Sequence, residues 1–478
     1  MSEISETQSD CVRLALPKGR LMSATTMLLQ DIGLGFEDYK DKTRQYRLKS
    51  ELFPRLSAKI FQEKDIPVQV SIGNYDLGIC GLDWIEELTA RYPASGLIKI
   101  SSLGYGEGNV YLSASYQSDV AANDDLKAKQ FNWCIASEYP NLAQDFALKM
   151  RLRSFNVFPV WGASEAYPPE NADLALLWVE NKEILEGYGL IPLKKLISST
   201  AYLIGNKKSI EGKELSQILN CFSGKFFSKP EIATKETIKV ERPVISLSNW
   251  RSKEIKMAIP DGHQQKPTSK LLIKAGINIE GYSEVISRRP DTDFEWLGIK
   301  VIRPQDMPLQ VANGNFDLAI TGMDWLSEHL YRYPASPVVK LLDLGFGGVK
   351  IVAAVSEAIQ VNNVAELRLF SKNKKYETLR VASEYVSTAD KYLRENHIHP
   401  YKLIPTWGAS EAFLPDDADL LIDNTQTGKT LEEHKLKVID VLFESTACLI
   451  GNGDKLNLPG IKERIEFLTQ LLKTGLSC

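Results

Sequence analysis

Short runs of β-branched and other apolar residues alternate along the chain with stretches that carry the 3.6-residue period of an amphipathic helix. The first apolar run, 12–16, is followed by Pro17-Lys-Gly-Arg20 and a predicted helix that continues to Leu29. A later strand pattern, 76–79, leads through a Gly-containing turn to a helix that starts at Trp84. Strands that alternate with helices in this way are typical of α/β sheets with parallel strands.

A second α/β unit follows within the same half of the chain. Strands are predicted at 112–115 and 133–136, a turn at 137–141, and a returning strand at 197–204. Two units joined by a returning strand predict two lobes around a cleft. Open α/β sheets bind ligands in such clefts, at the carboxyl ends of their strands.

The chain contains two copies of this pattern. Residues 65–95 match 306–336 at a constant offset, with 18 of 31 positions identical. Two further segments repeat later, 159–166 with 405–412 and 199–206 with 445–452. The period is far too long for a solenoid, so we infer a tandem duplication of one domain pair. The predicted boundaries are a disordered leader at 1–10, copy one at 11–224, a linker at 225–253 and copy two at 254–478.

The most informative turn is 423–431 in copy two, Asp-Asn-Thr-Gln-Thr-Gly-Lys-Thr-Leu. It follows a predicted buried strand at 418–422 and precedes 432–436, where a helix is expected to begin. A glycine, threonine hydroxyls and free amides at such a turn form a cradle for an anion. The alternative is an ordinary helix cap. Asp423, at the strand's end, suits sugar hydroxyls or a metal ion near a polyphosphate.

Composition excludes several classes of function. The net charge is −4 at pH 7, with 44% hydrophobic and 25% charged residues, which argues against a general nucleic-acid or membrane-surface binder. Six scattered cysteines suit a reducing cytoplasm and argue against structural zinc. No apolar run reaches the length of a membrane span, and the polar N-terminus differs from a secretory signal. We therefore expect a cytoplasmic protein.

An ordered set of motifs then resembles a known family, ATP phosphoribosyltransferase, and covers nearly the whole chain once per copy. The motifs are Leu16-Pro-Lys-Gly-Arg20, Asp65-Ile-Pro67, Asp76-Leu-Gly-Ile-Cys-Gly-Leu-Asp83, Ala136-Ser-Glu-Tyr-Pro-Asn141, Gly408-Ala-Ser-Glu411, the segment 418–431 and Ser445-Thr-Ala-Cys-Leu-Ile-Gly-Asn452. The resemblance implies a two-lobed α/β fold similar to type II periplasmic binding proteins. It also implies the first step of histidine biosynthesis, in which N1 of ATP attacks C1 of phosphoribosyl pyrophosphate (PRPP) and Mg²⁺-bound pyrophosphate leaves.

The resemblance implies roles for particular residues. For PRPP these are Asp423, Thr425, Thr427, Gly428, Lys429 and Thr430. For catalysis they are Asp423, Glu411, Lys18 and Arg20. For ATP or pyrophosphate they are Lys18, Arg20, Arg303, Thr321, Gly322 and Asp324, although a carboxylate such as Asp324 also serves at a helix start simply because the helix dipole favours it. Mg²⁺ is the expected cofactor, with its protein ligands unassigned.

Each copy departs from the family pattern in a different place. In copy one, Leu177 occupies the position of Asp423, and Lys182 that of Gly428. In copy two, Pro260-Asp-Gly-His263 replaces Pro17-Lys-Gly-Arg20. We therefore expect one active site per chain, built on copy two. Copy one would supply cations across an internal pseudo-dimer interface, from Lys18 and Arg20, with Arg44 and Arg47 as further candidates; alternatively it is only a scaffold.

Two questions of function stay open at this point. The runner-up is a non-catalytic small-molecule-binding or regulatory protein on the same fold, favoured by Asp261 and His263. The resemblance also leaves open whether regulation comes from a histidyl-tRNA-synthetase-like partner subunit or from the duplicated copy, and whether the chain forms a homo-oligomer. The tryptophans that recur in both copies, Trp84, Trp161, Trp325 and Trp407, are expected to pack the cores rather than bind adenine.

Overall fold

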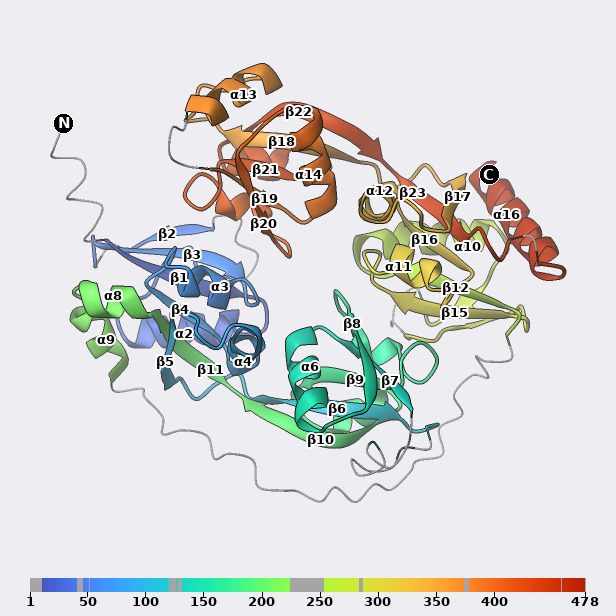
Figure 1. The fold of residues 1–478 in the computed structure, drawn as a ribbon, viewed down its shortest axis with the longest axis horizontal. Coiled ribbons are helices and arrows are strands. Elements are labelled where there is room, and N and C mark those ends of the chain that lie inside the picture. The colour runs from blue at the N-terminus through green and yellow to red at the C-terminus, as the bar shows by residue number, and fades with distance from the viewer. Residues whose placement is uncertain are drawn as a thin grey trace.

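The computed structural model describes residues 11–40, 46–50, 52–118, 120, 126, 131–223, 253–282, 287–373, 378–456 and 458–477. The predicted leader, and the predicted linker except for Lys253, lie outside these residues. The described chain forms four α/β lobes, two in each copy, which we name 1A, 1B, 2A and 2B (Figure 1). The predicted fold class, two tandem two-lobed α/β copies, is confirmed.

Lobe 1A is built on a six-stranded mixed sheet in the order β2-β3-β1-β4-β11-β5. β1 runs parallel to β3 and β4, while β11 returns antiparallel. β1 and β3 are almost continuously buried, as expected for strands whose sheet is covered on both faces. The elements of lobe 1A are β1 (Val12–Lys18), α2 (Met22–Asp31), β2 (Arg47–Lys49), β3 (Leu56–Gln62), α3 (Ile66–Ser71), β4 (Leu77–Gly81), α4 (Leu82–Arg91), β5 (Leu97–Ser102), β11 (Ala201–Asn206), α8 (Lys207–Gly212) and α9 (Ser216–Ser223).

Lobe 1B has a five-stranded sheet in the order β10-β6-β9-β7-β8, in which β7 is parallel to β8 and β9, and β6 is antiparallel to β9 and β10. Its elements are β6 (Gly108–Ser115), β7 (Asn132–Ser137), α6 (Pro140–Lys149), β8 (Ser154–Pro159), the 3₁₀ turn η1 (Ser164–Ala166), β9 (Leu174–Val179), α7 (Glu183–Gly187) and β10 (Leu190–Ser199). The predicted returning strand at 197–204 is divided at Thr200, because β10 completes lobe 1B and β11 enters lobe 1A.

Copy two repeats this plan. Lobe 2A has the sheet order β15-β12-β16-β23-β17, and lobe 2B has β20-β19-β21-β18-β22. Lobe 2A contains β12 (Ile255–Pro260), η3 (Gly262–Gln264), α10 (Gln265–Lys274), β13 (Ile279–Glu280), β14 (Asp291–Thr292), β15 (Leu297–Ile302), α11 (Met307–Ala312), β16 (Leu318–Gly322), α12 (Met323–Arg332), β17 (Val338–Asp343), β23 (Ala447–Asn452) and α16 (Ile461–Ser477). Lobe 2B contains β18 (Val349–Ser356), α13 (Val364–Asn373), β19 (Leu379–Ser383), α14 (Val386–Glu395), β20 (Tyr401–Pro405), η4 (Ser410–Phe413), β21 (Leu420–Thr425), α15 (Lys429–Glu433) and β22 (Leu436–Ser445).

The prediction that a helix begins at 432–436 is wrong. A short helix, α15, starts earlier at Lys429, directly after Gly428, and β22 begins at Leu436. Lys435 between them has φ +54°, a left-handed conformation that turns the chain out of the helix. The preceding strand also runs further than predicted, since β21 extends to Thr425.

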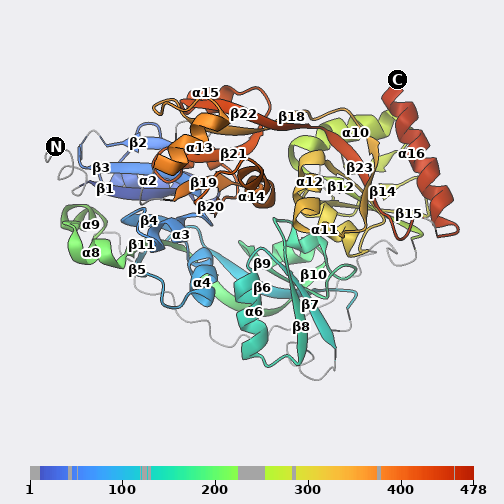
Figure 2. The same ribbon diagram turned by 45° about the horizontal axis from the view of Figure 1, so that its top comes forward.

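Each copy packs head to tail on the other, lobe 1A on lobe 2B and lobe 1B on lobe 2A (Figure 2). Apolar clusters cross both junctions, with Phe61 against Phe413 at the first and Tyr167 among the lobe 2A side chains at the second. A buried lysine reinforces each junction. Lys59 donates to Asp417 at 2.7 Å, and at the equivalent position Lys300 donates to Glu170 at 2.8 Å. The two copies therefore form an internal pseudo-dimer.

None of the helices in the described parts of the chain is both long and apolar enough to cross a bilayer.

Candidate functional site

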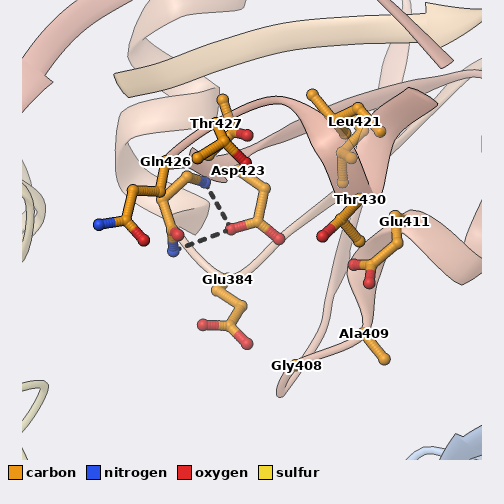
Figure 3. A pocket seen from close by; sticks show the side chains of 12 residues that line it. Glu384, Gly408, Ala409, Glu411, Leu421, Asp423, Gln426, Thr427 and Thr430 are labelled. Carbon is orange, nitrogen blue, oxygen red and sulfur yellow. Dashed lines mark hydrogen bonds between the residues drawn. The ribbon is translucent and has the colours of Figure 1, made fainter. Parts of the chain in front are cut away.

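A cavity of about 380 Å³ opens on lobe 2B at the end of β21. Three segments that are distant in the sequence surround it: the turn before α14, the turn before η4, and the loop between β21 and α15 (Figure 3). They meet here because β19 and β21 are neighbouring parallel strands, whose carboxyl ends lie at one edge of the sheet. The cavity is lined by Glu384, Gly408, Ala409, Glu411, Leu421, Asp423, Asn424, Thr425, Gln426, Thr427, Thr430 and Leu431.

The loop after Asp423 has the shape of an open anion cradle. Gly428 has φ +79°, a left-handed conformation that favours glycine, and it turns the chain into α15. The Gly428 N–H donates to the Thr425 hydroxyl at 3.0 Å, and the Lys429 N–H donates to the Thr427 hydroxyl at 3.4 Å. Two of the threonines thus shape the turn itself. Thr427 and Thr430 are exposed at its surface, where an incoming anion can reach them.

Three carboxyl groups face the same space: Glu384, Glu411 and Asp423 (Figure 3). Burial raises the pKa of Glu384 to about 9, and the negative charge of Asp423 adds to the rise. Burial also raises the pKa of Asp423 to about 7, with Glu411 contributing. The pKa of Glu411 is raised by burial, and the positive charge of Lys18 opposes the rise. Such a cluster gains stability when a cation enters.

Sequence reasoning assigned no role to Glu384. The signal was present, because the Ser-Glu-Tyr turn occurs in both copies, at Ser137-Glu-Tyr139 and Ser383-Glu-Tyr385. Its serine and tyrosine have structural roles. The Ser383 hydroxyl donates to the Ile422 carbonyl at 2.6 Å and accepts from the Tyr385 N–H at 2.9 Å. These bonds tie the Glu384 turn directly to β21 and so hold its carboxyl group opposite Asp423.

Copy one brings Lys18 to the edge of this cavity. The Lys18 ammonium donates to the Tyr46 hydroxyl at 2.7 Å, and the Tyr46 ring stacks on His434, which directly follows α15, at a centroid distance of 4.9 Å. Lys18 is also the positive charge that acts on Glu411. The predicted Lys18 thus lies where copy one meets the copy-two loop.

Arg20 lies elsewhere, in the cleft of copy one. Its guanidinium donates to Asp83 at 2.7 Å and to Glu63 at 3.0 Å, and it lies 4.1 Å from the ring centroid of Trp178. Its Nε and Nη2 groups are therefore engaged within copy one. Of the further candidates, Arg47 forms an ion pair with Asp416 at 3.0 Å across the junction, and Arg44 lies outside the described residues.

The residues predicted for ATP or pyrophosphate in copy two are not gathered at the cavity. Arg303 follows β15, whose carboxyl end faces lobe 1B; it lies against Gly162 and donates to Asp261 at 3.3 Å. Thr321 is buried, and its hydroxyl donates to the Pro304 carbonyl at 2.9 Å. Gly322, which caps α12, comes so close to Asp324 that a β-carbon there would meet its carboxylate.

Asp324 has the structural role that was considered as its alternative. It begins α12 and accepts hydrogen bonds from the Tyr385 hydroxyl at 2.6 Å and the Ser445 hydroxyl at 2.9 Å. Because Tyr385 belongs to lobe 2B, this carboxylate connects the two lobes of copy two behind the cavity.

The corresponding cleft of copy one is filled by side chains. Leu177 is buried in an apolar cluster where copy two has Asp423. The neighbouring Trp178 lies so close to Gly108 that a β-carbon there would be 2.2 Å from the indole. Glu165, the counterpart of Glu411, forms an ion pair with Arg288 of copy two at 2.8 Å. This cleft is therefore closed by contacts within the protein.

The donor set at the copy-two cavity suits a hard divalent cation. Mg²⁺ prefers carboxylate and phosphate oxygens, and three carboxyl groups face the cavity with raised pKa values. Among the described residues, no group of three or more His, Cys, Asp or Glu side chains is close enough to hold a metal ion by itself. The carboxylates therefore fit Mg²⁺ that arrives with a phosphate ligand and completes its coordination there.

A family model described as HisG: ATP phosphoribosyltransferase matches residues 62–224 and 303–474. The chain belongs to the ATP phosphoribosyltransferase family. This confirms the predicted family, the tandem duplication and the predicted main function, a transferase of histidine biosynthesis.

Individual relatives match one copy's length at a time. The ATP phosphoribosyltransferase of Prosthecochloris aestuarii is 33% identical over 224 residues, which are 46% of this chain and 70% of that protein. The enzyme of Thermodesulfovibrio yellowstonii is 31% identical over 229 residues, 47% of this chain and 73% of that protein.

Solved structures give weaker matches. The ATP phosphoribosyl transferase (HisG:HisZ) complex from Thermotoga maritima includes a chain that is 20% identical, with a TM-score of 0.39 over 47% of this chain and 98% of that chain. The alkanesulfonate-binding protein SsuA from Xanthomonas axonopodis pv. citri is 14% identical, with a TM-score of 0.31 over 45% of this chain and 72% of that chain.

Proposed function

We propose that this chain is a glycosyltransferase that joins N1 of ATP to C1 of PRPP at one active site, built on copy two and completed by copy one. The carrying observation is that the copy-two cleft combines the Asp423 loop with a cavity, while Leu177 and Trp178 occupy the equivalent place in copy one. Lys18 supports the composite character of the site, because it belongs to copy one and faces Glu411 of copy two.

The proposed roles follow from position. The loop 425–430 holds the 5-phosphate through the exposed hydroxyls of Thr427 and Thr430 and through backbone amides of the turn, as helix-start turns hold anions. Asp423, at the base of the loop, accepts hydrogen bonds from the ribose hydroxyls. In the transfer the C1–oxygen bond to pyrophosphate breaks as the N1–C1 bond forms, so the protein chiefly positions two anions and stabilises the charge on the leaving group.

Cations are needed because both substrates and the cavity are negatively charged. We propose that Mg²⁺ enters bound to PRPP and that carboxylates among Glu384, Glu411 and Asp423 complete its coordination, where it would neutralise the charge on the departing pyrophosphate. Lys18 supplies positive charge on the Glu411 side. Arg20 is left out of this proposal, since Glu63 and Asp83 already engage it.

The experiment is to count PRPP sites by calorimetric titration in the presence of Mg²⁺ and, in parallel, to follow pyrophosphate release with ATP. We expect one PRPP per chain, and we expect Asp423→Leu, which copies Leu177, to lose binding and turnover while the protein stays folded. Asp390→Leu, on α14 in an ion pair with Arg394 and outside the cavity lining, is the matched control. Two sites, or none, would contradict the proposal.

The same assay separates the enzyme from the non-catalytic alternative, which Asp261 and His263 favour because they replace two cations. A chain that binds PRPP but releases no pyrophosphate with ATP would support that alternative. Adding a HisZ subunit, as named in the Thermotoga maritima complex, to an inactive chain would test whether a partner is required. The expected cytoplasmic location stays a prediction; the cysteines among the described residues are free thiols.

A further inference from the structure

One lysine outside the predicted site lies between the two copies, near residues of the copy-two cavity. Lys64 is in the turn between β3 and α3, at the carboxyl end of a lobe 1A strand. Its ammonium lies among three indole rings, 5.3 Å from the centroid of Trp407, 5.5 Å from Trp161 and 6.0 Å from Trp84. The three rings come from lobes 2B, 1B and 1A, so Lys64 lies where these lobes meet.

Trp407 departs from the expectation that the recurring tryptophans pack the cores, while Trp84, Trp161 and Trp325 follow it. Trp325 is buried and stacks on Tyr385 as expected. Trp407, in contrast, has 36% of its surface exposed and directly precedes Gly408, which lines the cavity. The indoles favour a cation through their π faces, but they supply no anionic oxygen.

Lys64 has negative charge around it and no ion pair. Among the described residues it forms no hydrogen bond or ion pair, although Glu138, Asp65, Glu384 and Asp306 are close enough to act on its charge. Glu384 is the member of this group that lines the cavity, and Lys64 is the positive charge that opposes the rise in the pKa of Glu384. A lysine held over indole rings can turn toward an anion without breaking a salt bridge.

The equivalent position in copy two carries no charge. There, between β15 and α11, the residue is Gln305, next to Asp306 as Lys64 is next to Asp65. The same contrast holds at Lys18, whose counterpart is Asp261. At both positions copy one has the cation, and this cation lies toward the cavity of copy two. Copy two has an uncharged or negative residue there, on the side of the filled cleft of copy one.

We propose that Lys64 is a substrate-binding residue of the copy-two site, contributed by copy one, which binds a polyphosphate group on the Glu384 side of the cavity. This rests on the proposed function of the cavity and adds a second cation opposite Lys18. Two groups have the required chemistry, the pyrophosphate of PRPP and the triphosphate of ATP. Both would approach the Glu384 side if the 5-phosphate occupies the loop at 425–430.

The test uses the full chain and separate calorimetric titrations with PRPP, ATP and inorganic pyrophosphate, each with Mg²⁺. Lys64→Met keeps the apolar contact with the indoles and removes the charge, and we expect at least about a tenfold loss of affinity for one of the polyphosphates. Loss for PRPP and pyrophosphate alone would assign Lys64 to the leaving group; loss for ATP alone would assign it to the nucleotide. Lys64→Arg should restore most of the affinity.

Lys99→Gln is the control. Lys99 is on β5 and forms an exposed ion pair with Glu86, and this variant should bind all three ligands as the wild type does. Thermal unfolding of each variant shows whether it is folded, and Lys64→Gln takes the place of Lys64→Met if the latter is not. Affinities within about twofold of wild type for all three ligands would overturn the inference. Unchanged affinities in the Lys64 variants would leave the proposed function standing. A wild-type chain that fails to bind PRPP would instead overturn the proposed function itself.

Discussion

At the scale of single residues, equivalent positions in the two copies carry opposite chemistry. Asp423 faces a cavity, whereas Leu177 is buried in an apolar cluster. Lys18 bonds to the Tyr46 hydroxyl, whereas its counterpart Asp261 accepts from Arg288 at 2.9 Å. The backbone tolerates both sets of side chains, so the fold alone does not decide which cleft binds a ligand.

The cations Lys18 and Arg20 are expected to respond differently to truncation. Lys18→Ala should reduce turnover by about a hundredfold with little change in stability, because its charge faces Glu411 in the cavity. Arg20→Ala should lower stability by about 3–5 kcal/mol and leave turnover close to wild type below the unfolding transition, since it strands Glu63 and the buried Asp83. Urea unfolding and pyrophosphate release measure the two effects. The reverse pattern would place Arg20, not Lys18, at the site.

Stability of the free protein should depend on pH through Glu384. Its pKa is raised from 4.5 to about 9 by burial and by Asp423, with Asp65 and Glu411 adding and Lys64 opposing. The folded protein therefore keeps a proton that the unfolded chain releases, and stability falls as pH rises from about 4.5 to about 9. Glu384→Gln should reduce this fall by roughly 1–3 kcal/mol, measured as unfolding free energy at pH 5 and pH 8 without ligands. An unchanged pH dependence would show that Glu384 is ionised in the free protein.

At the scale of secondary-structure elements, the sequence predicted much of the fold, because periodicity and repetition are local signals. The strands at 12–16, 76–79 and 133–136 and the loop after Asp423 are present. The prediction of a helix beginning at 432–436 was wrong because a lysine gives no sign in the sequence that the chain adopts a left-handed conformation at Lys435. The direction in which a strand end points across the duplication also leaves no signal in the sequence, so the position of Arg303 against Gly162 of lobe 1B could not be predicted.

At the scale of the whole molecule, the junctions between copies rest on buried lysines. Lys59 and Asp417 are 3% and 2% exposed, and Asp417 also accepts from the Tyr75 hydroxyl at 3.1 Å. A charge buried without its partner is costly, whereas a neutral pair need not be. At the other junction the position of Asp417 is occupied by Asn171, which accepts from Lys300.

Removing one partner of the Lys59–Asp417 pair should therefore destabilise the protein more than replacing both. Lys59→Met is expected to lower the free energy of unfolding by about 3–5 kcal/mol, and the double variant Lys59→Met with Asp417→Asn by much less. Lys149→Met, from an exposed ion pair with Asp145, is the control and should change it by less than about 0.5 kcal/mol. Urea denaturation gives all three values. Equal losses in the single variant and the control would show that the pair contributes little to the junction.

The head-to-tail packing joins the four lobes into a closed loop: 1A to 1B through β10 and β11, 1B to 2A, 2A to 2B through β22 and β23, and 2B back to 1A. Because every lobe is attached to two others, we expect that one lobe cannot rotate without moving its neighbours. A change in the angle between lobes 1A and 1B would then change the angle between lobes 2A and 2B. A larger side chain at Gly108, which lies against Trp178 in copy one, is therefore expected to change the opening of the copy-two cleft as well.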